Sequence, residues 1–95
     1  MTTTEFPALR EFFRGYLHQD TLAEYGGALA AAAQFRADAD EARTCSVQRE
    51  FTSLRSTIPG EDLAAVNAAI ERHGAAYQFA SIREWREFAD VLLEE

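Results

Sequence analysis

The 95-residue sequence contains one cysteine, two prolines and no lysine. With Cys45 alone, no disulfide can form within the chain, and a reducing compartment is favoured. Cys45, His18 and His73 lie far apart in the sequence and include no close ligand pair such as His-x3-His, so we expect neither a metal nor another cofactor. Because Cys45 falls in a segment of helical pattern, we interpret it as a small apolar side chain of the core.

Positive charge is also scarce. Nine arginines face sixteen acids, which gives a formal net charge of −7. This excess of negative charge repels a phosphate backbone and argues against nucleic-acid binding as the main activity. The same charge suits a basic protein partner, since opposite charges speed the encounter of two proteins.

Long apolar runs are missing as well. The longest, Ala28 to Ala33, is too short and too weakly apolar to cross a bilayer. The first five residues have neither the basic region nor the apolar region of a secretory signal. We therefore expect a soluble cytoplasmic protein that does not associate with a membrane.

The apolar content is sufficient for one core. Hydrophobic residues make up 47% of the chain and aromatic residues 12%. A chain of this length buries somewhat more than about 60% of its unfolded surface in a single core. We expect one domain over residues 1–95, with residues 1–4 and 94–95 flexible.

Apolar residues recur every three or four positions, which is typical of helices that bury one face. The segments with this spacing are residues 7–17, 28–39, 40–54 with Asp40 as N-cap, 63–70 ending at Gly74, and 82–92 opening on the capping box of Ser81 and Glu84. Breaks are expected at Gly26-Gly27, Pro59-Gly60 and Gly74. No segment alternates over the length of a strand, so the predicted fold is an all-α compact bundle of about five helices.

One polar string follows the first apolar stripe. It reads Tyr16-Leu17-His18-Gln19-Asp20, with Leu22, Glu24, Tyr25 and Gly26 a few positions on. The string resembles the signature of the bacterial contact-dependent growth inhibition immunity proteins, which is usually Tyr-Phe-His-Gln-Asp-Trp. Leu17 stands here in place of the usual Phe, and Thr21 in place of the usual Trp.

Two further features resemble the same family. An acidic and apolar helix near the middle carries Glu50-Phe51 and Leu54, and the last helix carries the pair Glu84-Trp85. The resemblance implies an immunity protein that binds a cognate toxin domain and blocks it without catalysis. Toxin domains of such systems are often nucleases with basic clefts, so the implied partner is a basic domain.

His18 and Asp20 also allow a catalytic interpretation. A histidine and an orienting carboxylate could serve a small hydrolase as general base and positioning group. We favour a structural role, because a histidine in the last turn of the first helix caps free carbonyl groups there and Asp20 can end the turn. The sequence has no nucleophile motif such as Gly-x-Ser-x-Gly, so we do not expect an enzyme.

Exposed acids and aromatic residues are the candidates for partner binding. Tyr25 beside Glu24 is the best candidate for an exposed anchor, and Asp38, Asp40 and Glu41 form a solvated acidic turn. Trp85 lies on an apolar stripe and is assigned to the core. We expect a monomer before complex formation, and a generic acidic helical interaction module is the alternative to an immunity protein.

Overall fold

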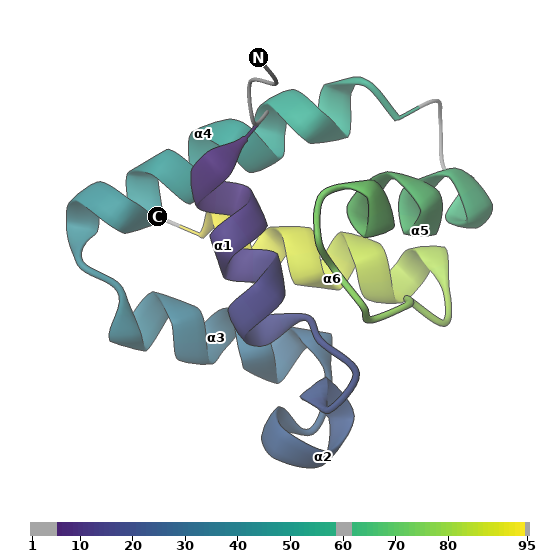
Figure 1. Cartoon of the computed structure of the whole chain (residues 1–95), viewed down its shortest axis with the longest axis horizontal. Coiled ribbons are helices and arrows are strands. Elements are labelled where there is room, and N and C mark those ends of the chain that lie inside the picture. The colour runs from purple at the N-terminus through teal and green to yellow at the C-terminus, as the bar shows by residue number, and fades with distance from the viewer. Residues whose placement is uncertain (1–5, 59–61, 95) are drawn as a thin grey trace.

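The computed structural model describes residues 6–58 and 62–94, and these residues form helices and no strand (Figure 1). The helices are α1 Pro7–Tyr16, α2 Thr21–Tyr25, α3 Ala28–Asp38, α4 Glu41–Ser56, α5 Leu63–Arg72 and α6 Ile82–Leu93. The predicted all-α class is confirmed, and five of the helices match the five predicted segments. The short helix α2 was not predicted. Residues 1–4, Pro59-Gly60 and Glu95 lie outside the described residues.

Helix α1 starts at Pro7, whose missing N–H costs nothing in a first turn. The N–H of Leu9, which has no partner within the helix, donates to Glu50 Oε1 of α4 at 3.0 Å. The helix ends at Tyr16, and Leu17 closes it by donating its N–H to the Phe13 carbonyl. The expectation that His18 lies in the last turn is therefore wrong.

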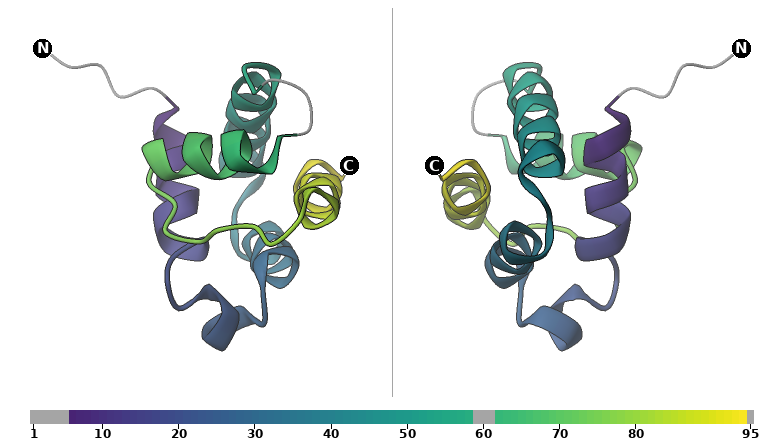
Figure 2. Two further views of the ribbon diagram at one scale, coloured as in Figure 1. Left: turned by 90° about the vertical axis from the view of Figure 1, so that its right-hand side faces the viewer. Right: turned by 90° about the vertical axis from the view of Figure 1, so that its left-hand side faces the viewer.

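The helices pack around one aromatic core. Helix α1 lies against α4 and α3, α3 lies against α6, and α2 projects beyond α3 at one end of the molecule (Figures 1 and 2). Trp85 is only 5% exposed, with its ring centroid 5.2 Å from that of Phe51 and 5.3 Å from that of Phe79. Trp85 is thus a core residue, as its place on the apolar stripe predicts.

The predicted N-caps of α4 and α6 are present. Asp40 Oδ1 accepts the N–H of Arg43 at 2.8 Å, and Ser81 Oγ accepts the N–H of Glu84 at 3.1 Å. The Glu84 carboxylate accepts from the N–H of Ala80 and from the hydroxyl of Tyr77. Glu84 therefore fixes the segment that leads into α6.

Residues 75–80 connect α5 to α6 without regular structure. Gly74, at φ 106°, turns the chain out of α5 in a conformation that favours glycine. The carboxamide of Asn67 then holds Phe79 at both ends, since its Nδ2 donates to the Phe79 carbonyl and its Oδ1 accepts the Phe79 N–H. The Leu17 carbonyl accepts the N–H groups of Ala76 and Tyr77, which ties this connection to the end of α1.

Cys45 is exposed, so its assignment to the core is wrong. The buried positions of α4 are Val47, Phe51 and Leu54. Cys45 precedes Val47 by two residues, which turns it by about 200° around the helix. The apolar stripe of α4 therefore passes on the opposite side.

Candidate functional site

The string that follows α1 is closed by one threonine. Thr21 is fully buried; its Oγ1 donates to the Tyr16 carbonyl at 2.7 Å and accepts the N–H of His18 at 2.8 Å. A single hydroxyl thus satisfies one acceptor and one donor that the end of α1 leaves free. This contact fixes the start of α2 against the end of α1.

The ring of His18 lies in this loop and contacts two groups. Its Nδ1 accepts the main-chain N–H of Asp20 at 3.1 Å, and its Nε2 is 3.3 Å from Glu24 Oε2. The carboxylate beside the ring therefore belongs to Glu24, four residues after Asp20. The pairing of the His18 ring with the Asp20 carboxylate, which the catalytic interpretation would require, is not present, because Asp20 meets the ring through its backbone.

Two tyrosines stack beside this histidine. The rings of Tyr16 and Tyr25 are 5.6 Å apart and inclined by 21°. The Tyr16 hydroxyl donates to Asp38 Oδ2 at 2.9 Å, and Gln34 Nε2 donates to the other Asp38 oxygen at 2.8 Å. Burial, followed by the hydrogen bond to Asp38, raises the pKa of Tyr16 above its ordinary value. Burial, followed by the charge of Glu24, raises the pKa of Tyr25.

These contacts join residues of α1, α2 and α3 into one surface. We define the acidic aromatic strip as Glu24, Tyr25, Tyr16 and Asp38, which are linked in that order along the chain or by the contacts above. The strip contains three of the predicted partner-binding residues, Glu24, Tyr25 and Asp38. Tyr25 is half-buried by its stack on Tyr16, so it is less exposed than an anchor was expected to be.

The other predicted residues lie around the strip. Asp40 is occupied as the N-cap of α4, and Glu41 follows it in the first turn. Gln19 and Asp20 are exposed in the loop before α2. Gly26 ends α2 at φ 92°, in the left-handed region that favours glycine.

One exposed residue of the string was not singled out from the sequence. Leu22 on α2 is 69% exposed, and it is the large apolar side chain that the described residues leave in solvent. A signal was available, because residues 15–35 contain Asp20 and Glu24 but no arginine or lysine. A leucine between two acids, in a stretch without arginine or lysine, is a candidate for contact with a basic partner.

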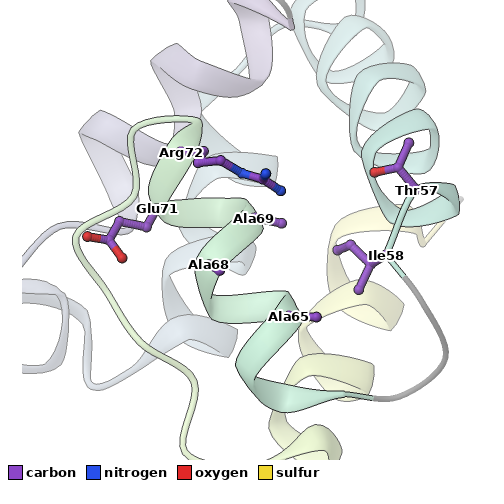
Figure 3. A pocket seen from close by; sticks show the side chains of 7 residues that line it. All are labelled: Thr57, Ile58, Ala65, Ala68, Ala69, Glu71 and Arg72. Atoms are coloured by element: carbon purple, nitrogen blue, oxygen red, sulfur yellow. The ribbon is translucent and has the colours of Figure 1, made fainter.

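A groove lies at the opposite side of the molecule, between the end of α4 and helix α5 (Figure 3). Its volume is about 550 Å³, and its lining residues are Thr57, Ile58, Ala65, Ala68, Ala69, Glu71 and Arg72. Glu71 and Arg72 bring one charge of each sign, so the groove has no preference for a charged partner. We therefore do not choose it as the site.

Within residues 6–58 and 62–94, no three His, Cys, Asp or Glu side chains are grouped so that they could hold a metal ion. None of the helices described there is long and apolar enough to cross a membrane.

A family model described as CdiI immunity protein matches residues 5–93. The chain belongs to this family. The match covers nearly the whole chain and confirms the resemblance seen in the string from Tyr16 to Asp20. No curated protein and no solved structure matches the chain. Membership in the CdiI immunity family makes this chain an immunity protein, whose partner is a cognate toxin that it neutralises.

Proposed function

We propose that this immunity protein acts in the cytoplasm, where it binds a basic, nuclease-type toxin domain through the acidic aromatic strip and performs no chemistry itself. The observation that carries the proposal is the strip, in which two carboxylates flank two stacked tyrosines. Aromatic side chains that keep a polar end are typical anchors of protein interfaces. Carboxylates beside them suit a partner of positive charge.

The distribution of charge supports a basic partner. Residues 15–42 contain five acids and one arginine, so this stretch carries more than half of the net charge of −7. The arginine, Arg36, is turned inward, and its Nη1 donates to the carbonyls of Val91 and Leu92 at the end of α6. Arg43, the next base along the chain, lies close enough for its charge to act on the Tyr16 phenol, and it offsets part of this negative charge. A nuclease cleft must attract phosphate and is therefore positive, so this acidic face can approach it under long-range attraction.

The geometry of His18 supports inhibition without catalysis. One ring nitrogen accepts a backbone N–H and the other faces Glu24, so both are occupied within the protein. A general base needs a free nitrogen within reach of a substrate proton. We assign His18 to the support of α2, and we propose that residues 1–95 act as one domain and as a monomer until the toxin binds.

Co-expression tests the proposal most directly. The toxin domain encoded beside this gene is expressed in cells with and without the immunity protein, and the purified pair is mixed to measure association and dissociation rates. We expect protection of the cells, a stable complex, and association that slows as salt rises while dissociation changes little. Unprotected cells together with no complex would leave only a generic acidic interaction module.

Charge reversal locates the surface. The double variant Glu24→Lys, Asp38→Lys should slow association about tenfold or more, because rim charges act mainly on the encounter rate. The matched control is Glu71→Lys, Glu87→Lys, which changes the net charge equally on α5 and α6. If both variants slow association equally, net charge and not the strip attracts the toxin.

A further inference from the structure

Among the described residues, Leu22 is the large apolar side chain that is exposed, whereas the others are buried or half-buried. Of the described residues, the core contains 20 apolar side chains that are at most 5% exposed, while Leu22 is 69% exposed. An exposed leucine gains nothing from folding, and burial of its side chain elsewhere is favourable. A single exposed leucine is common in folded proteins, and Leu22 is singled out by its place on α2 between the exposed acids Asp20 and Glu24, the second of which belongs to the acidic aromatic strip.

The helix that carries Leu22 is held in place by its neighbours. A five-residue helix is not stable by itself, because the cost of nucleation exceeds the gain from so few hydrogen bonds. Here Thr21 is fixed by two hydrogen bonds, Glu24 faces the His18 ring, and Tyr25 stacks on Tyr16. Helix α2 thus presents Leu22 in a fixed position, on the part of the molecule that projects beyond α3 (Figure 2).

The charges around Leu22 restrict what can cover it. Asp20 and Glu24 lie two residues before and after it, both exposed, and residues 15–35 contain no arginine or lysine. A second copy of this chain would bring acids against acids, and an anionic membrane would repel the same surface. A protein surface with an apolar pocket and a basic rim is complementary in both respects.

We propose that Leu22 is the apolar anchor of the complex and inserts into an apolar pocket with a basic rim on the cognate toxin domain. This proposal rests on the proposed function, since it names the contact through which the same acidic surface binds. The acids of the strip set the rate of encounter, whereas the buried leucine sets the lifetime of the complex.

The test compares three proteins: the wild type, Leu22→Ala and Leu22→Met. Alanine removes the apolar end of the side chain and keeps a good helix former in α2, while methionine conserves the volume. Binding to the toxin domain encoded beside the gene is measured by surface-coupled kinetics, and thermal unfolding of each free variant is measured in parallel. Sedimentation of the free wild type over a range of concentrations reports self-association.

We expect Leu22→Ala to raise the dissociation rate about tenfold or more, the scale of one buried leucine, with association nearly unchanged. Leu22→Met should stay close to the wild type, and all three should unfold at the same temperature. Equal dissociation rates of wild type and Leu22→Ala would overturn this inference and leave the proposed function intact. Absence of binding by the wild type would overturn both. Self-association of the wild type that Leu22→Ala abolishes would assign the leucine to a second copy and overturn the inference.

Discussion

Two segments without regular structure, the loop between α1 and α2 and the connection between α5 and α6, are each fixed by one polar side chain, but one presents an apolar residue to solvent and the other places one in the core. Thr21 satisfies a carbonyl and an N–H of residues 16–18 with one hydroxyl, and Asn67 satisfies the carbonyl and the N–H of Phe79 with one carboxamide. Beyond Thr21 the chain turns its apolar side chain, Leu22, toward solvent. In the segment that Asn67 holds, the side chain of Phe79 lies in the core.

The difference shows how one device can support either binding or stability. A polar side chain that makes two main-chain hydrogen bonds, buried as in Thr21 or half-buried as in Asn67, fixes a segment that has no regular structure of its own. Where the fixed segment points inward, it adds to the core. Where the fixed segment points outward, it holds exposed side chains such as Leu22 in place, although these side chains do not themselves stabilise the fold.

The largest loss of stability should come from a change in the aromatic core. Replacing Trp85 by alanine removes a ring that contacts Phe51 and Phe79, and should lower the free energy of unfolding by about 3 to 5 kcal/mol. Urea denaturation followed by circular dichroism measures the change, with Trp85→Phe as the milder control. A midpoint that barely moves would mean that Trp85 is exposed in solution.

Replacing Thr21 and replacing Asn67 should have similar effects on stability but different effects on binding. Thr21→Val and Asn67→Leu each leave buried main-chain groups without a partner, so each should cost about 1 to 3 kcal/mol. Only Thr21→Val should also speed dissociation of the toxin, because it releases α2. The exposed residue Thr52, changed to valine, is the control for the loss of a hydroxyl. If Thr21→Val and Asn67→Leu bound the toxin with equal dissociation rates, the distinction between the two segments would be lost.

Two glycines beside the strip should respond in opposite directions. Gly26→Ala should destabilise by about 1 to 2 kcal/mol, since an alanine at φ 92° is strained although the space around it is open. Gly15→Ala should stabilise by about 0.5 to 1 kcal/mol, because this glycine is inside α1 and nothing lies within 4 Å of the added carbon. Thermal unfolding of both variants measures the two changes in melting temperature, and changes of the same sign would contradict the prediction.

The last prediction concerns the pH dependence of stability, and it compares Tyr77 of the α5–α6 connection with Tyr16 of the strip. Burial and then the hydrogen bond to Glu84 raise the pKa of Tyr77 from 10.0 to about 12. A group whose pKa is raised in the folded state stabilises it below its unfolded pKa, so this contribution should be present up to about pH 10 and lost as pH rises through 12. Melting temperatures between pH 9 and 12 should fall less steeply in Tyr77→Phe than in the wild type. Tyr16→Phe, whose phenol also has a raised pKa, is the comparison on the strip.

The sequence by itself determined the helical class and most of the helix ends. Spacing of apolar residues at three and four positions predicted α1, α3, α4, α5 and α6, because that spacing reports which face of a helix is buried. Asp40 and Ser81 were predicted as N-caps from local chemistry alone, and both accept the expected N–H groups. The string from Tyr16 to Asp20, together with the features that follow it, pointed to the family whose model matches residues 5–93.

Only the tertiary structure decided what surrounds that string. Helix α2 is too short to be predicted from periodicity, and it exists because Thr21, His18 and Tyr25 find partners in the loop and in α1. The contact between Tyr16 and Asp38 joins residues 22 positions apart, which no local pattern encodes. The direction of Leu22 toward solvent and of Cys45 away from the core also depended on how the helices pack, since a side chain is buried only where another element covers it.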